Sequence, residues 1–429
     1  MKNTVTVIGA GLAGVEAANI LAQNGIKVKL YEQKPKKFSP AHKLESFCEL
    51  VCSNSLKAKR INSASGLLKK EMELMGSLTV PLAFKNEVPA GGALAVDREA
   101  FSKSVTEAII NNPNIEVIYE EKTDFDPDEI TIIATGPLTE GKMAEKLKEL
   151  CGDMLSFYDA AAPIVNADSL DYSKVFTASR YSDDEGDYIN CPMNKEEYEL
   201  FYNELVNGEI ALLHDFDKIY EGCVPIEVLA KKGKDTMRFG PLKPVGLLNP
   251  HTNTRPYANL QLRKETKNGN MYNMVGFQTN LKFSEQKRIF SLIPGLQNAE
   301  FERYGVMHRN SFINSPKLIN PDLSLKDHKN IYIAGQLSGV EGYMESAAHG
   351  LLCGISALNR ILNKPQLELP NYTMLGGLIN HITTESKNFQ PMGAAFGLLP
   401  PLNIREKDKL KRYMLLSERS LEFFNKEDK

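Results

Sequence analysis

The chain has 429 residues, with 51 Lys and Arg against 54 Asp and Glu, and it is 42% hydrophobic and 24% charged. This composition excludes a disordered protein and a small single-core scaffold, because the length predicts two or three domains that each bury a core. The net charge of −3 gives no global attraction to nucleic acid, so taken alone it argues against an RNA or DNA partner.

The first residues, MKNTVTVIGA, run directly into a strand pattern and lack the charged and apolar regions of a signal peptide. No stretch approaches the roughly 18 apolar residues of a membrane span. We therefore expect a cytoplasmic protein with no membrane partner. The six cysteines are scattered without paired CxxC motifs, which predicts reduced thiols and neither a disulfide framework nor a metal site.

The strongest local pattern occupies the first 32 residues. It predicts a buried parallel strand over 4–8, a helix over 15–24 and a second strand over 27–31, with a glycine-rich turn between the first two. Such a turn lets a pyrophosphate approach a helix N-terminus, and an acidic residue after the second strand accepts hydrogen bonds from a ribose. A glycine-rich turn without a nucleotide is the open alternative. The predicted dinucleotide-binding residues are Gly9, Ala10, Gly11, Leu12, Ala13, Gly14 and Glu32.

Two later strand-to-glycine patterns favour FAD over NAD as the bound nucleotide. One ends at Gly136, and the other ends in Ala-Gly-Gln at 334–336 and is followed by Gly342. A late strand of this kind is typical of FAD-binding proteins, and a complete second GxGxxG for a nicotinamide domain is missing. We predict one bound FAD with NAD(P)H as a diffusible reductant, and we add Gly136, Gly335, Gln336 and Gly342 to the cofactor site.

The predicted fold is α/β, with a Rossmann-type FAD-binding domain interrupted by an inserted α+β domain. We expect residues 1–163 to form the first part of the FAD-binding domain and 164–302 to form the inserted, substrate-binding domain. Residues 303–429 complete the FAD-binding domain and end in a charged helix over 405–429 that we expect on the solvated surface.

Positive charge is concentrated in the inserted domain. Between Val224 and Phe290 there are twelve Lys and Arg and four Asp and Glu, a local excess of +8 that the whole-chain charge conceals. A solvated face balanced by the acidic stretch 183–187 is the alternative to an RNA-binding surface. The aromatic side chains nearby, Tyr257, Tyr272 and Phe277, could stack on bases or belong to the core. The candidate RNA contacts are Lys231, Lys232, Lys234, Arg238 and Arg255.

Several segments, taken together and in order, are specific enough to indicate a family. They are GAGLAG at 9–14, ELVCSNSL at 49–56, VPAGGALAVDR at 88–98, FYDAAAPI at 157–164, EGCVPIE at 221–227, VMHRN at 306–310 and GQLSGVEGY at 335–343. Together they resemble the folate- and FAD-dependent RNA uracil-5-methyltransferases. The resemblance continues to NFQPM at 388–392 and so covers nearly the whole chain.

The resemblance implies transfer of a methylene group from methylenetetrahydrofolate to uracil C5 by way of reduced FAD, with NAD(P)H as reductant. Because uracil C5 is a poor nucleophile, such methylation begins when a thiolate adds to C6. Cys52 and Cys223 lie in segments that resemble those carrying the family's two functional cysteines. We assign Cys223 to C6 attack and Cys52 to an assisting role. Glu227 is either a base or a structural carboxylate.

The folate would need an apolar slot beside the flavin and a partner for its carboxylate. His308 is the candidate for stacking and Arg309 for the carboxylate contact, although a lone His is as often a satisfied core residue. Gly91 and Gly92 would let the backbone approach a cofactor closely, unless their loop is simply a tight turn.

The family match leaves the RNA open. Its best-known members methylate the T-loop uridine of tRNA, which is our leading hypothesis, whereas a mollicute branch acts on a uridine of 23S rRNA and is the runner-up. DNA is not an expected partner, and the sequence does not indicate an oligomeric state. Two other classes stay open: an FAD-dependent oxidoreductase of a small molecule, and a non-catalytic RNA-binding flavoprotein, which gives no need for two motif-placed thiols.

Overall fold

The computed structural model describes residues 4–39, 41–181, 186–211, 224–386 and 389–427. Its first sheet has five parallel strands in the order β16-β7-β1-β2-β6. They are β1 (Thr4–Ile8), β2 (Lys27–Glu32), β6 (Ile115–Tyr119), β7 (Thr131–Ile133) and β16 (Ile331–Ile333). Because β16 pairs with β7, segments from both ends of the chain build one sheet. The early strands and the α/β class are as predicted.

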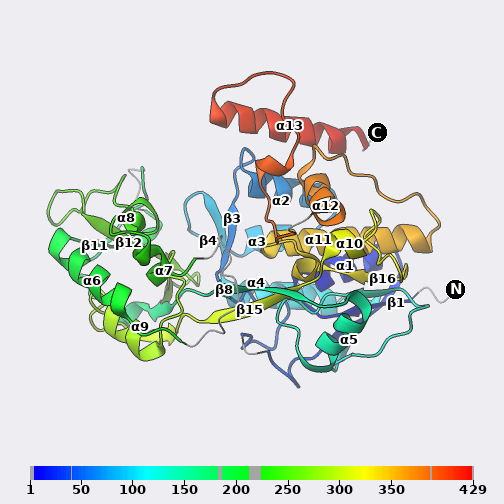
Figure 1. Ribbon diagram of the computed structural model, residues 1–429, viewed down its shortest axis with the longest axis horizontal. Helices are drawn as coiled ribbons and strands as arrows, with labels where there is room; N and C mark the ends of the chain where they lie inside the picture. The colour runs from blue at the N-terminus through cyan, green and yellow to red at the C-terminus, as the bar shows by residue number, and fades with distance from the viewer. Residues whose placement is uncertain (1–3, 40, 182–185, 212–223, 387–388, 428–429) are drawn as a thin grey trace.

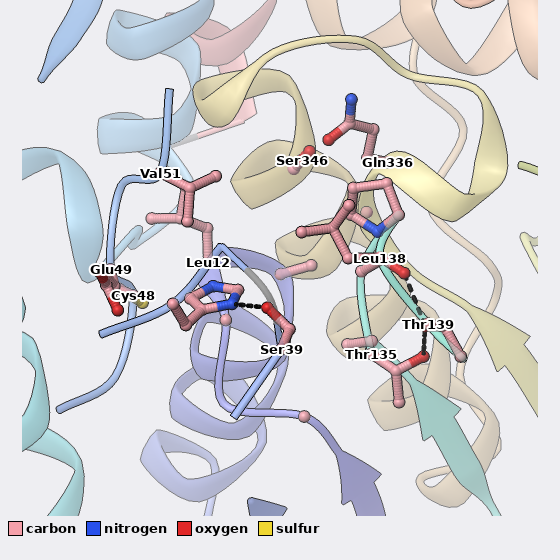
Figure 2. Close-up of a pocket in the computed structure, with 18 of the residues that line it drawn as sticks. Leu12, Ser39, Cys48, Glu49, Val51, Thr135, Leu138, Thr139, Gln336 and Ser346 are labelled. Atoms are coloured by element: carbon pink, nitrogen blue, oxygen red, sulfur yellow. Dashed lines mark hydrogen bonds between the residues drawn. The ribbon is translucent and has the colours of Figure 1, made fainter. Parts of the chain in front are cut away.

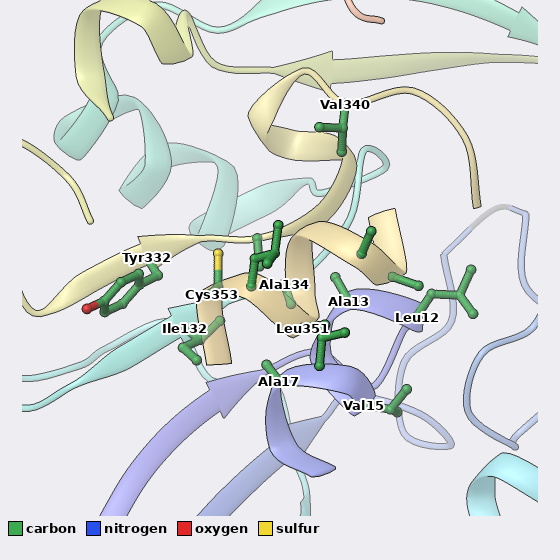
Figure 3. Packing of buried hydrophobic residues seen from close by; sticks show 14 of the residues in the cluster. Leu12, Ala13, Val15, Ala17, Ile132, Ala134, Tyr332, Val340, Leu351 and Cys353 are labelled. Atoms are coloured by element: carbon green, nitrogen blue, oxygen red, sulfur yellow. The ribbon is translucent and has the colours of Figure 1, made fainter. Parts of the chain in front are cut away.

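Two helices, α1 (Leu12–Gln23) and α11 (Tyr343–Ile361), cross closely over this sheet. A β-carbon added at Gly350 would lie 2.1 Å from the carbonyl oxygen of Ala13, so the crossing requires a residue without a side chain. Figure 3 shows Ala13 and Ala17 of α1 packed with Leu351 of α11 in one apolar cluster. Helix α1 begins three residues before the predicted start.

The inserted segment forms a second lobe with its own buried cluster, which runs from Val165 to Ala299 (Figure 1). Its six antiparallel strands lie in the order β10-β11-β12-β13-β9-β14. They are β9 (Ile164–Asn166), β10 (Phe176–Thr177), β11 (Tyr188–Met193), β12 (Ala258–Lys264), β13 (Met271–Met274) and β14 (Phe301–Arg303). The helices are α6 (Lys195–Asn207), α7 (Ile226–Lys231), α8 (Thr236–Phe239) and α9 (Phe283–Phe290).

A pair of antiparallel strands, β8 (Leu155–Ala160) and β15 (Met307–Phe312), runs between the two lobes (Figure 1). A small sheet of β3 (Ser55–Ala58), β4 (Glu87–Val88) and β5 (Ala93–Val96) belongs to the larger lobe. The other helices of that lobe are α2 (Ala64–Leu74), α3 (Thr79–Lys85), α4 (Arg98–Ile110), α5 (Gly141–Cys151), α10 (Ser315–Leu318), α12 (Met374–Thr383) and α13 (Lys409–Glu427).

Helix α13 corrects one expectation from the sequence. One of its faces is buried against α2, with Ser417, Ser420 and Phe424 all less than one tenth exposed. The hydroxyl of Ser420 donates to the buried carboxylate of Glu71 on α2. Only the charged face of α13 is therefore a solvated surface. Within the described part of the chain, no helix is both long enough and apolar enough to cross a membrane.

Candidate cofactor and active site

A cavity of about 520 Å³ opens where the first sheet's strands end. Its wall is built by the turn between β1 and α1, the end of β2, the loop before β3, the turn after β7 and the segment between β16 and α11. Figure 2 shows Cys48, Glu49 and Val51 on one side of this cavity and Thr135, Leu138 and Gln336 on the other. Its size is typical of a small-molecule or cofactor site.

The glycines of the first turn have distinct structural roles. An added β-carbon at Gly14 would lie 1.8 Å from the carbonyl oxygen of Gly9, so Gly14 packs the helix onto the turn and does not line the cavity. At Gly11, which does line the cavity, an added β-carbon would meet no atom within 4 Å. The open space at Gly11 leaves the backbone accessible to a ligand at the start of α1.

The acidic residue at the end of β2 is held in place at the same wall. Glu32 is buried, and its carboxylate accepts hydrogen bonds from the backbone N–H of Ala10 (3.0 Å) and of Lys34 (2.9 Å). Its position beside the glycine turn matches that of an acceptor for a ribose hydroxyl. Gly9, Ala10, Gly11, Leu12 and Ala13 line the cavity with it.

The later glycine segments reach the same cavity from the other side. Gly136, Gly335, Gln336 and Gly342, the other residues predicted to bind the cofactor, all line it. The backbone N–H of Gly335 donates to Nδ1 of His349 on α11 at 3.1 Å. Burial lowers the pKa of His349 to about 4, so the ring is neutral at physiological pH and Nδ1 can accept this bond. The buried His349 therefore anchors the turn that begins at Gly335.

Cys52 lies half-buried on the cavity wall, beside the first residue of α11. The phenol oxygen of Tyr343 is 3.0 Å from Sγ and accepts hydrogen bonds from the backbone N–H of Cys52 (2.8 Å) and Ser53 (3.3 Å). These two bonds use the oxygen's lone pairs, which leaves its O–H to donate to sulfur. Burial raises the pKa of Tyr343 well above its ordinary value, so the donor stays protonated.

Two further polar residues of this wall were not predicted. Lys57 of β3 forms an ion pair of 2.7 Å with Glu345, whose side chain is almost completely buried in the first turn of α11. Both line the cavity, as does Tyr343. The sequence had shown Tyr343 only as part of a motif, because its partner Cys52 is distant in the chain.

Several predicted site residues do not line the cavity. Gly91 belongs to a loop that contacts the inserted lobe, where its N–H donates to the carboxylate of Asp187 at 2.6 Å, and Gly92 follows it. Glu227 is buried, and its oxygens accept from the hydroxyl of Thr279 (2.9 Å) and the N–H of Asn280 (2.8 Å). The sequence left open whether Glu227 is a base or a structural carboxylate, and these hydrogen bonds favour a structural carboxylate.

The remaining thiol and folate candidates are only partly described. Cys223 lies outside the described residues. His308 lies on β15 opposite Asp159 of β8, and Arg309 is exposed, with Nε donating to Ser156 Oγ at 3.1 Å. Their neighbour Asn310 is buried and lines the cavity. Strand β15 therefore brings the VMHRN segment to the cavity's edge.

The basic candidates of the inserted lobe divide by their partners. Lys234 pairs with Glu199 at 2.7 Å and Arg238 pairs with Asp235 at 2.6 Å, while its guanidinium stacks on the ring of Tyr257. Tyr272 and Phe277 are buried, so they belong to the core. The other basic candidates, Lys231, Lys232 and Arg255, have exposed side chains.

Residues 4–365 match the family model described as "Glucose inhibited division protein A". The chain belongs to this family. It is 56% identical over 422 residues to a protein of Caldicellulosiruptor bescii named "Methylenetetrahydrofolate--tRNA-(uracil-5-)-methyltransferase TrmFO", with 97% of each chain covered. A protein of Fusobacterium nucleatum with the same name is 54% identical, with 99% of this chain and 98% of the relative covered. These relatives confirm the family resemblance that the motifs indicated.

Among solved structures, Aquifex aeolicus GidA in its form II crystal superposes with a TM-score of 0.70. The match covers 99% of this chain and 73% of that chain at 15% sequence identity. At that identity the likeness concerns the fold, and it confirms the predicted architecture of a Rossmann-type sheet with an additional antiparallel lobe.

Proposed function

We propose that the chain is a folate- and FAD-dependent RNA uracil-5-methyltransferase that acts on the T-loop uridine of tRNA. The observation that carries the proposal is Cys52, whose sulfur lies on the wall of a dinucleotide-type cavity and within hydrogen-bond distance of Tyr343. Relatives that are 56% and 54% identical over nearly the whole chain carry the name of this activity on tRNA, which supports it.

The residues of the cavity fit FAD as the bound group. The turn 9–14 would hold the pyrophosphate at the start of α1, and Glu32 would bind the ribose. Gly335 and Gln336 would contact the ribityl chain of the flavin. Bound FAD would supply the one-carbon relay and the electrons that complete the methyl group, with NAD(P)H as their source. The described residues supply the shape and the hydrogen-bond acceptor for that cofactor.

The two motif cysteines would divide the covalent work. We assign Cys223 to the attack on uracil C6, which makes C5 nucleophilic. Cys52 would assist with the flavin-bound methylene or with removal of the C5 proton. The O–H of Tyr343 points to Cys52 Sγ, so it can stabilise a thiolate there. His308 and Arg309 remain the folate candidates, and the exposed lysines of the inserted lobe are the candidate RNA contacts.

The direct test uses purified protein, methylenetetrahydrofolate labelled at its one-carbon unit, NAD(P)H and a tRNA transcript. We expect label in 5-methyluridine at the T-loop, and none in a transcript with cytidine at that position. A yellow protein that transfers no carbon to any uridine-containing RNA would instead favour a small-molecule oxidoreductase.

The identity of the RNA is tested in cells. Deletion of the gene should remove 5-methyluridine from tRNA, as measured by mass spectrometry of its nucleosides. Loss of the modified base from 23S rRNA alone would overturn the tRNA assignment and favour the ribosomal substrate.

The role of Cys223 is tested by Cys223→Ala, with Cys191→Ala as the control. Cys191 is fully buried in the core of the inserted lobe, so its replacement tests the effect of losing a thiol elsewhere in that lobe. We expect Cys223→Ala to abolish methylation while FAD stays bound and the control stays active. Full activity of Cys223→Ala would remove this thiol from the mechanism.

A further inference from the structure

The loop that carries Cys52 is held by the inserted lobe. Arg263 of β12 is buried, and it donates from Nε to Asn54 Oδ1 (3.0 Å) and from Nη2 to Ser53 Oγ (2.9 Å). Asn54 is fully buried and returns a bond to the same strand, from Nδ2 to the carbonyl of Lys264 (2.9 Å). The two residues that follow Cys52 are therefore fixed by β12.

The part of the loop that precedes Cys52 is held by a residue of the larger lobe. Arg98, at the start of α4, donates to the carbonyl of Leu50 and forms an ion pair of 3.0 Å with Glu265, which directly follows β12. The side chains of this pair are 11% and 2% exposed, so solvent does little to weaken it. Cys52 thus lies between two arginine-held points, at residue 50 and at residues 53–54.

Three buried or half-buried arginines act on the sulfur. The guanidinium groups of Arg98, Arg263 and Arg303 all interact electrostatically with Cys52. Glu265 is paired with Arg98 and also acts on Arg263. The carboxylate of Glu49, which acts on Arg303, accepts hydrogen bonds from the backbone N–H groups of Lys43 and Leu44. Arg303 is half-buried at the end of β14, and its side chain forms no hydrogen bond or ion pair with the described residues.

Burying these guanidinium groups has a free-energy cost if they only join the two lobes. Burial lowers the pKa of Arg263 and of Arg303, so holding both guanidinium groups charged at this place is unfavourable. An anionic sulfur between the arginines offsets that cost, and the Tyr343 O–H adds a hydrogen bond to it. The charge pattern therefore points to a function at Cys52.

We propose that Arg263, with Arg98 and Arg303, is a positioning residue that fixes the Cys52 loop across the two lobes and keeps its sulfur as a thiolate. The inserted lobe would then have two roles. It would bind RNA, and it would set the reactivity of the Cys52 thiol in the larger lobe. The role of this thiol in methylation rests on the proposed function, whereas its position and its charge state do not.

The test measures alkylation of Cys52 by iodoacetamide in the FAD-loaded protein, without RNA or folate, by mass spectrometry of the Cys52 peptide from pH 5.5 to 9.5. For Arg263→Gln we expect the midpoint of the rate profile to rise by roughly one pH unit, which is about tenfold slower alkylation near neutrality. Arg263→Lys keeps the charge and should keep the midpoint. The matched control is Arg180→Gln, since Arg180 binds Gln261 on the same strand and the carbonyl of Lys243.

A second variant separates charge from loop geometry. The Arg303 side chain donates no hydrogen bond to the described residues, so Arg303→Gln should raise the midpoint of the rate profile without loosening the loop. This variant remains informative even if Arg263→Gln folds poorly. An unchanged midpoint in both variants would overturn the proposal, and so would faster alkylation at every pH, which would mean that the arginines only shield the loop. Since no methylation is measured, a midpoint shift in a protein that methylates nothing would count against the proposed function alone.

Discussion

Gly11→Ala and Gly14→Ala test the cofactor site because the two glycines lie in one turn but meet different surroundings. A β-carbon at Gly14 would lie 1.8 Å from the carbonyl oxygen of Gly9, whereas one at Gly11 would meet nothing within 4 Å. Gly11 has extended backbone angles, φ −75° and ψ −177°, which alanine adopts readily. We therefore expect Gly14→Ala to damage the fold and Gly11→Ala to damage only cofactor binding.

The sizes of the two effects follow from these contacts. At position 14, α1 or the turn must move by more than an ångström, and such overpacking costs about 3 kcal/mol or more against rigid backbone. At position 11 the cost to the free protein is that of an alanine N-cap, about 1 kcal/mol or less. A ligand at one hundred times its Kd adds about 2.7 kcal/mol of stability, and Gly11→Ala should lose that increment.

The assay compares thermal unfolding of apoprotein and FAD-reconstituted protein, together with bound flavin absorbance. We expect the wild type to gain stability with FAD. Gly11→Ala should stay within about 1 kcal/mol of wild-type apoprotein with or without FAD, and Gly14→Ala should unfold earlier in both states. A Gly11→Ala protein that binds FAD and gains the full wild-type increment would refute the assignment of this turn to the pyrophosphate.

Three further predictions concern separate parts of the molecule. Burial raises the pKa of Glu71 from 4.5 to about 7, so the folded state retains a proton that the unfolded chain releases, and stability should fall by about 3 kcal/mol as pH rises from 4.5 to 7. Thermal melts of Glu71→Gln across that range should show a flatter pH dependence than the wild type, and an equal slope would contradict the assignment. Cys52→Ser should lose methylation in the labelled-folate assay while retaining FAD, and an active variant would exclude a catalytic thiol there. Reversing Lys231 and Lys232 to Glu should raise the Kd for tRNA and flatten its dependence on salt, unlike Lys103→Glu on α4, and an unchanged salt slope would indicate a merely solvated face.

The glycine turn between β1 and α1 could be predicted from the sequence because its determinants are local. Gly9, Gly11, Gly14 and Glu32 lie within one strand-helix-strand unit, where the spacing indicates which glycine packs against the turn and which faces the cavity. The late segment that ends in Gly335 was predictable for the same reason. In each of these segments, neighbouring residues determine the local backbone geometry without contacts from distant parts of the chain.

The surroundings of Cys52 could not be predicted in this way. Tyr343 and Arg263 are both far from it in sequence, and they reach it only after α11 and β12 have packed. A charge count cannot tell a buried arginine from a surface one, so Arg263 was counted with the candidate RNA surface although it faces the thiol loop. Helix α13 shows the same difficulty, because two of its buried residues, Ser417 and Ser420, are polar and carry no hydrophobic signal in the sequence.

The excess of positive charge in the inserted lobe therefore has two parts with different roles. Lys231 and Lys232 are exposed and can act on a polyanion at a distance, with a strength that falls as salt rises. Arg263 is buried, so salt screens it little and its field acts on the one loop that it holds. Raising the salt concentration should then weaken RNA binding while leaving the pH profile of Cys52 alkylation in place, and a common salt dependence of both would contradict this division.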